Sequence, residues 1–130
     1  MNSEIHTLKT ELIDNITSYM KYGGAEDESD PDYDPEFDAG YEQRHIDRCS
    51  EILESYFSAL AGIDQVNRNE AIMSAVKSAV LALNEVNNEC DGNMIETDQR
   101  EQLCEIIISA ANNNGLQSSQ YDITEEWRDW

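Results

Sequence analysis

The chain has 130 residues, of which 28 are acidic and 8 are basic, so its formal net charge is −20. One domain with a single core fits this length, and the hydrophobic fraction of 39% is enough to fill that core. Direct binding of nucleic acid is disfavoured, because neutralising phosphates needs a basic patch and the basic residues are scattered along the chain. A negative field of this size favours a cationic partner.

The first segment has the spacing of an amphipathic helix. Its apolar residues recur every three or four positions, at Ile5, Leu8, Leu12, Ile16, Tyr19 and Met20. This spacing predicts a helix over Ser3–Tyr22 that ends at Gly23. Because acidic residues interrupt the apolar positions, the segment is neither a secretory signal nor a membrane span, and we expect a cytoplasmic protein.

Residues 23–43 form the most acidic stretch, with nine carboxylates and no Lys or Arg. Charge, Gly and Pro leave too little apolar surface to order its first part, so we expect a mobile loop up to Tyr33. Asp34-Pro35-Glu36 is typical of a helix start, with an N-cap, a proline at the first helical position and an acid in the first turn. A second helix is therefore expected from residue 34 to about residue 61.

Two further helices complete the expected fold. One covers residues 69–90 and ends at Asp91-Gly92, and small residues on it would permit close helix packing: Ala71, Ala75, Ala79 and Ala82. The other is capped by Thr97 or Asp98, turns Cys104 inward and ends at Gly115. The sequence thus predicts an all-α fold, a four-helix antiparallel bundle or a related helical packing, with residues 1–130 as a single domain.

The last residues predict a short turn capped by Thr124, which places Trp127 and Trp130 on one side. Two interpretations are open for this tryptophan pair. It docks on the bundle and holds the end of the chain in place, or it binds a partner.

The alternation of Asp30, Asp32 and Asp34 resembles the start of an EF-hand calcium loop. The remaining positions do not fit, because the sixth is Pro35 instead of Gly and the twelfth is Tyr41 instead of Glu. A dedicated calcium loop is therefore not predicted. A less specific module that responds to Ca²⁺ or Mg²⁺ stays open as an alternative function.

The sequence shows no apparatus for catalysis. Glu42-x-x-His45 matches half of a di-iron motif, but the only other histidine, His6, lacks the matching glutamate. The three cysteines, Cys49, Cys90 and Cys104, occupy apolar stripes and contain no C-x-x-C pair, as expected for reduced thiols in a core. We therefore expect neither enzymatic activity nor a cofactor or metal site.

The acidic stretch is the candidate binding surface, with Tyr33, Phe37 and Tyr41 recurring every four residues among its carboxylates. Aromatic side chains beside charges are common in interface hot spots, although core burial is the alternative for Phe37 and Tyr41. The predicted partner-binding residues are Glu26, Asp27, Glu28, Asp30, Asp32, Tyr33, Asp34, Glu36, Phe37, Asp38 and Tyr41.

The last third of the chain carries I-E-T-D-Q-R-E-Q-L-C at residues 95–104 and D-I-T-E-E-W-R-D-W at residues 122–130. These motifs resemble immunity proteins of contact-dependent growth inhibition and other polymorphic-toxin systems. The resemblance implies a cytoplasmic inhibitor that covers the active site or substrate groove of one basic toxin domain, often a nuclease. A nucleic-acid mimic that blocks a DNA-binding protein is the other alternative, and homo-oligomerisation stays open.

Overall fold

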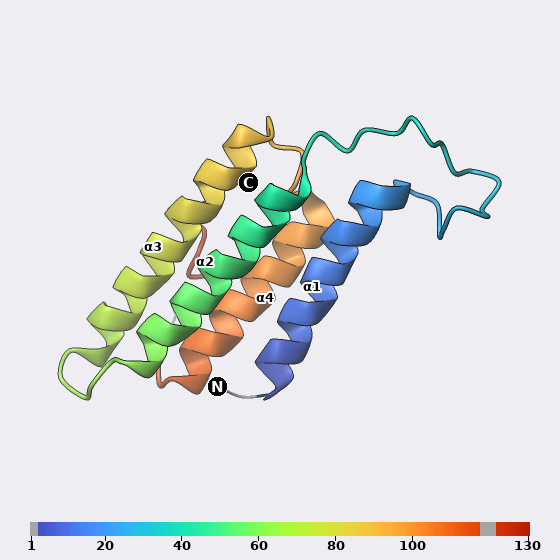
Figure 1. The fold of residues 1–130 in the computed structure, drawn as a ribbon. Coiled ribbons are helices and arrows are strands. Elements are labelled where there is room, and N and C mark those ends of the chain that lie inside the picture. Colours follow the sequence, from blue (N-terminus) through green and yellow to red (C-terminus); the bar gives the residue numbers. More distant parts are fainter. Residues whose placement is uncertain (1–2, 118–121) are drawn as a thin grey trace.

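The computed structural model describes residues 3–117 and 122–130. It contains four helices, α1 (Ser3–Tyr22), α2 (Gln43–Ala61), α3 (Arg68–Glu89) and α4 (Thr97–Asn113). Successive helices run in opposite directions and lie side by side (Figure 1). The all-α, four-helix prediction is therefore confirmed. Within the described residues, none of the helices combines the length and the apolar character that crossing a membrane requires.

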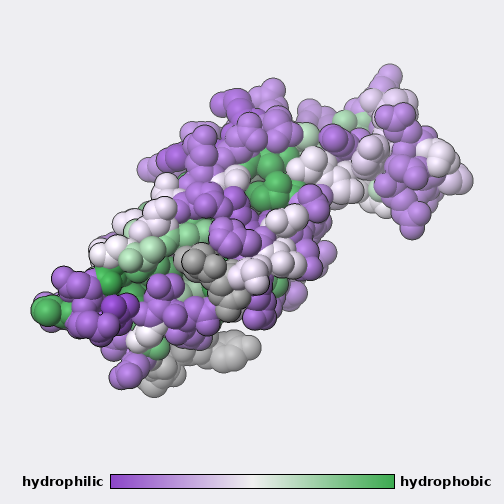
Figure 2. Space-filling view, turned by 60° about the horizontal axis from the view of Figure 1, so that its bottom comes forward, coloured by the Kyte–Doolittle hydropathy of each residue, from purple (hydrophilic) through white to green (hydrophobic). Residues whose placement is uncertain are grey.

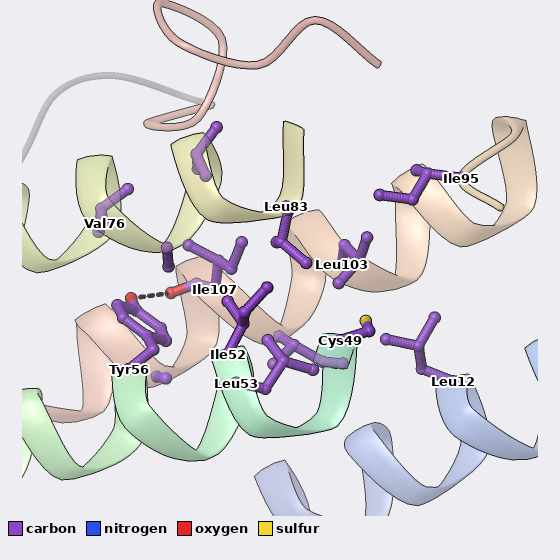
Figure 3. Packing of buried hydrophobic residues seen from close by; sticks show 14 of the residues in the cluster. Leu12, Cys49, Ile52, Leu53, Tyr56, Val76, Leu83, Ile95, Leu103 and Ile107 are labelled. Carbon is purple, nitrogen blue, oxygen red and sulfur yellow. Dashed lines mark hydrogen bonds between the residues drawn. The ribbon is translucent and has the colours of Figure 1, made fainter. Parts of the chain in front are cut away.

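The core lies where the four helices converge. The main contacts join α2 to α3 and α1 to α4, and α2 also contacts α1 and α4. Figure 3 shows Leu12 of α1, Leu53 of α2, Leu83 of α3 and Leu103 of α4 in this one cluster, and all four side chains are fully buried. The largest apolar side chains are thus removed from water together, which is the main stabilising contribution to such a fold.

Tyr56 adds a polar contact to this core. Its hydroxyl donates to the backbone carbonyl of Ile107 at 2.8 Å and so links α2 to α4 (Figure 3). Burial raises the pKa of Tyr56, which therefore stays a donor at physiological pH.

The second helix starts eight residues later than predicted, with Gln43 in place of Pro35 as its first residue. Oδ1 of Asp34 accepts the backbone N–H of Glu36 at 2.9 Å, and the N–H of Phe37 reaches the carbonyl of Asp34 at 3.1 Å, so the predicted start forms a single turn. Gly40, with φ +86°, then takes the chain out of helical geometry. The helix begins after Glu42, whose N–H donates to Nδ1 of His45 at 2.9 Å.

The remaining boundaries differ from the predictions by one or two residues. The predictions for α1 and α3 are confirmed, although α3 begins and ends one residue earlier than predicted. The N-cap of α4 is Glu96 and not Thr97 or Asp98, because the N–H of Glu96 bonds Oε1 of Gln99 at 3.2 Å, as in a capping box. The side chain of Cys104, which was predicted to face the core, is half-buried.

Residues 122–130, which we call the C-terminal segment, pack against α3 and α4. Nδ2 of Asn84 in α3 donates to the carbonyl of Trp127 at 2.8 Å, and Sγ of Cys104 in α4 lies 3.5 Å from Oγ1 of Thr124. Trp127 and Trp130 are partly buried against the core. Of the two interpretations of the tryptophan pair, docking on the bundle is the one that the structure supports.

Candidate functional site

Residues 23–42, which we call the acidic loop, join α1 to α2. Figure 1 shows the loop extending away from the bundle beyond the end of α1. In the space-filling view the same segment is a hydrophilic projection that stands apart from the body of the molecule (Figure 2). Its carboxylates are therefore separated in space from most of the other charged groups of the chain.

Four aspartates shape the backbone of this loop. In each case Oδ1 accepts the backbone N–H of the residue two positions later, at 2.8 or 2.9 Å. The four are Asp27, Asp30, Asp34 and Asp38. The stretch that composition predicts to be a mobile loop is thus a series of Asx turns. Composition misses such turns, because they depend on local hydrogen bonds and not on apolar burial.

The same hydrogen bonds favour the ionised carboxylates. The hydroxyl and the backbone N–H of Ser29 lower the pKa of Asp27 below its ordinary value. The backbone N–H groups of Asp32 and Glu26 do the same for the pKa of Asp30. Both aspartates therefore carry their negative charge at neutral pH.

The aromatic residues of the loop pack on α1. The ring of Phe37 meets that of Tyr19 edge to face, with centroids 5.4 Å apart. The ring of Tyr33 lies 6.1 Å from that of Tyr22. The rings of Phe37 and Tyr33 are therefore half-buried and hold the loop against α1. They are less accessible to a partner than the sequence predicts.

Tyr41 belongs to the core and not to the exposed surface. Only 5% of it is exposed, and its hydroxyl donates to the carbonyl of Ile16 in α1 at 2.8 Å. Its neighbour Gly40 approaches Asn93 so closely that a Cβ at position 40 would lie 2.5 Å from Nδ2 of Asn93. The end of the loop is thus held against α1 and the connection before α4.

No ion pair neutralises the eight carboxylates between Glu26 and Asp38 within residues 3–117 and 122–130. The ion pairs found there lie elsewhere: Lys9 with Glu54, Arg44 with Glu42, Arg48 with Glu51, and Arg128 with Asp122. All eight residues are exposed except Asp30, which is half-buried. Negative charge therefore accumulates on the loop and is available to a cation.

His45 is a buried structural residue, with 4% of it exposed. Its Nδ1 accepts the N–H of Glu42, and its Nε2 lies 4.0 Å from Oε2 of Glu89. The described part of the chain contains no group of three or more His, Cys, Asp or Glu side chains that could hold a metal ion. In particular, Asp30, Asp32 and Asp34 do not converge.

The cysteines are poor nucleophiles. Burial raises the pKa of the Cys49 thiol to about 12, and it also raises the pKa values of Cys90 and Cys104. All three are free thiols in the structure. At neutral pH they stay protonated, and the thiolate is the reactive form.

A groove between α2 and α3 is a feature that sequence reasoning missed. Its volume is about 390 Å³, and eight small residues line much of it: Ser55, Ala59, Ala71, Ser74, Ala75, Ser78, Ala79 and Ala82. The sequence predicted that the alanines of α3 pack closely against another helix. All four alanines line the groove, where Ala79 is buried and Ala71, Ala75 and Ala82 are half-buried. Repeated Ala and Ser at helical spacing was the available signal.

Comparison of the chain with protein-family models, curated proteins and solved structures found no significant match. The function is therefore inferred from the residues and geometry described above.

Proposed function

We propose that this chain is an inhibitor that binds a basic protein through the acidic loop. The observation that carries the proposal is the set of eight carboxylates from Glu26 to Asp38, which project from the bundle with no ion pair among the described residues. A basic partner supplies the cations that this surface lacks.

The geometry of the loop suits fast and specific association. A net charge of −20 attracts a cationic partner over long distances and accelerates encounter. The Asx turns and the contacts of Phe37 and Tyr41 with α1 shape the loop before binding, which reduces the entropy lost when the complex forms. Carboxylates on the outer side of such turns meet lysine and arginine side chains without first breaking internal ion pairs.

We further propose that the partner is a toxin domain with a basic substrate groove, such as a nuclease. Two observations support this assignment, the resemblance of residues 95–104 and 122–130 to immunity proteins and the charge of the acidic loop. A groove that binds phosphates by their negative charge also accepts a row of carboxylates. Bound in this way, the loop keeps the nucleic acid substrate out of the groove.

The test is binding to the toxin domain encoded beside the gene of this chain, measured by calorimetry at several salt concentrations. We expect a stable complex whose affinity falls as salt rises, because salt screens the attraction. Polylysine serves as the control for unspecific attraction. Absence of any complex with the toxin domain would contradict the proposal that the partner is a toxin.

A loop variant tests the surface itself. It neutralises four residues whose side chains accept no hydrogen bond within the described structure, by the changes Glu26→Gln, Glu28→Gln, Asp32→Asn and Glu36→Gln. The control removes four exposed charges from the helices and the C-terminal segment: Glu11→Gln, Glu101→Gln, Glu105→Gln and Glu125→Gln. We expect the loop variant to weaken binding by at least about tenfold more than the control, since several charge pairs are lost. Equal weakening would place the interface elsewhere.

Competition separates the two inhibitor hypotheses. An inhibitor of a toxin nuclease blocks cleavage of added nucleic acid by its cognate toxin domain. A nucleic-acid mimic instead displaces duplex DNA from a host DNA-binding protein and needs no toxin.

A further inference from the structure

The two ring nitrogens of His45 have different surroundings. His45 is the third residue of α2, and 4% of it is exposed. Its Nδ1 accepts the backbone N–H of Glu42 at 2.9 Å. Its Nε2 is buried as well but has no hydrogen-bond partner among the described residues, and Oε2 of Glu89 in α3 lies 4.0 Å from it. One nitrogen is therefore satisfied and the other is not.

The hydrogen bond at Nδ1 determines where the neutral ring carries its proton. A ring nitrogen that accepts an N–H cannot bear a hydrogen itself, so neutral His45 is the Nε2–H tautomer. A separation of 4.0 Å between Nε2 and Oε2 of Glu89 is too long for a hydrogen bond. The neutral ring thus keeps a buried donor without an acceptor, which is unfavourable.

Charged groups surround the ring on several sides. The groups beside it, or beside its neighbours Glu42 and Glu89, are Asp38, Arg44 and Cys90. Nε of Arg44 donates to Oε2 of Glu42 at 2.8 Å, so these two charges offset each other. Burial raises the pKa of the Cys90 thiol, which stays uncharged. No other carboxylate of the described residues, from α1, α4 or elsewhere, comes as near to a ring nitrogen as that of Glu89.

We propose that His45 is a proton switch, in which protonation of the ring opens the N-terminal cap of α2. The second proton adds to Nδ1, because Nε2 already carries one. Two N–H groups then face each other, and the hydrogen bond from Glu42 is lost. The charged ring at the same time gains attraction to the carboxylate of Glu89 through Nε2–H. Each protonation state therefore satisfies one side of the ring and leaves the other unsatisfied.

The switch acts where the acidic loop enters the bundle. Glu42 and His45 form a capping box, in which the side chain of each residue accepts the backbone N–H of the other, and protonation removes one of these two bonds. Tyr41, the residue before Glu42, remains bonded to Ile16. We therefore expect the first turn of α2 to open locally while the bundle stays folded. This inference does not depend on the proposed basic partner, because it concerns the free chain.

Nuclear magnetic resonance of the whole chain tests the switch, in a titration over the range in which histidine side chains change charge. We expect the ring nitrogens to show the Nε2–H tautomer at the alkaline end. In the step in which the ring gains its proton, the protection of the Glu42 amide against hydrogen exchange should fall at least about threefold, since one hydrogen bond is lost. Unchanged protection would overturn the proposal. So would an Nδ1–H tautomer, or a ring that stays neutral until the chain unfolds.

Two matched variants assign the step to His45. In His45→Gln the new side chain accepts the Glu42 N–H as in a capping box but does not titrate. His6→Gln removes the other histidine of the chain. We expect the protection of the Glu42 amide to stay constant within about twofold in His45→Gln, since no bond is lost, and to show the full step in His6→Gln. A full step in His45→Gln would refute the proposal.

A second pair of variants tests the attraction to Glu89. Glu89→Gln removes the carboxylate near Nε2, and Glu85→Gln removes one that lies a helical turn earlier in α3. We expect Glu89→Gln to move the step to lower pH by more than Glu85→Gln does, because the nearer carboxylate stabilises the charged ring more. Equal displacements would show that the charged ring does not pair with Glu89, and the account of two alternative states would fail.

Discussion

The acidic loop and the C-terminal segment are both irregular, acidic and shaped by Asx turns, yet they end in different environments. In the loop, the turn at Asp30 leaves its charge without a basic partner in the described structure. In the C-terminal segment, Oδ1 of Asp122 accepts the N–H of Thr124 at 2.9 Å, while Oδ2 pairs with Nη2 of Arg128 at 3.0 Å. Turn chemistry alone therefore does not decide whether an acidic segment packs on a bundle.

Partners from the helices account for the rest of this difference. Asn84 of α3 bonds the backbone of both Trp127 and Asp129, and Asn88 donates to Oδ2 of Asp129 at 3.3 Å. The guanidinium of Arg128 also lies 5.9 Å from the ring of Trp130. Two amides of α3 thus hold the C-terminal segment on the bundle, and Arg128 within the segment neutralises Asp122. The loop relies on contacts of its aromatic residues, and its carboxylates from Glu26 to Asp38 have no basic partner in the described structure.

The largest change in stability should come from replacing Tyr41, which anchors the end of the acidic loop to α1. We expect Tyr41→Ala to lower the free energy of unfolding by about 3 kcal/mol, because it leaves a cavity beside α1 and removes the hydrogen bond to Ile16. Urea denaturation followed by circular dichroism measures this change. The control is Tyr33→Ala, a half-buried position that should lose less than half as much. Equal losses would mean that Tyr41 does not anchor the loop.

Removal of the Arg128 cation should loosen the turn that the C-terminal segment forms around Asp122. We expect Arg128→Gln to lower the free energy of unfolding by about 2 kcal/mol, since it leaves a partly buried carboxylate without its cation. The emission of Trp127 and Trp130, the only tryptophans of the chain, should also shift to longer wavelength. The matched control is Arg44→Gln, which breaks an exposed pair and should change stability by less than about 0.5 kcal/mol. An unshifted spectrum would contradict this account.

Low pH should weaken the packing of the C-terminal segment, because Asp122 becomes protonated. Burial opposes ionisation of Asp122, but the hydrogen bonds from Thr124 and Arg128 outweigh it, so the pKa of Asp122 lies below its ordinary value of 3.8. A group whose pKa is lower in the folded state stabilises the fold above the unfolded pKa and ceases to do so as pH falls through the folded value. We therefore expect tryptophan emission to shift below about pH 3.8, and Asp122→Asn to remove that step. A step near pH 6 would point to a different group.

Neutralising the loop should have the smallest effect on stability. The four-residue loop variant described above removes charges that make no ion pair in the described structure, so we expect the free energy of unfolding to stay unchanged or to rise by up to about 0.5 kcal/mol as repulsion is relieved. Thermal unfolding measures the difference. A clear loss of stability would show that these carboxylates, like Asp122, have structural partners.

The helices could be predicted from apolar spacing because each one buries a continuous stripe. The start of α2 could not, since Asp34-Pro35-Glu36 satisfies the local rules for a cap, and the positive φ of Gly40, which interrupts the helix, is visible only in the structure. The burial of Tyr41 depends on a contact with Ile16, which lies 25 positions away in the sequence. The carboxylates of the loop could be identified from composition alone. The groove could not be predicted, because its existence depends on how closely α2 and α3 pack against each other.

The two ends of the acidic loop are closed by glycines, and this has a consequence for the evolution of the chain. The ring of Phe37 covers Gly23, and Asn93 abuts Gly40, so the entry and exit points cannot accept larger residues without shifting their neighbours. Between these points the loop contacts α1 through the rings of Tyr33 and Phe37. Insertions and deletions between residues 26 and 32 therefore leave the helices undisturbed. Lineages can lengthen, shorten or recode this projection while inheriting the same scaffold.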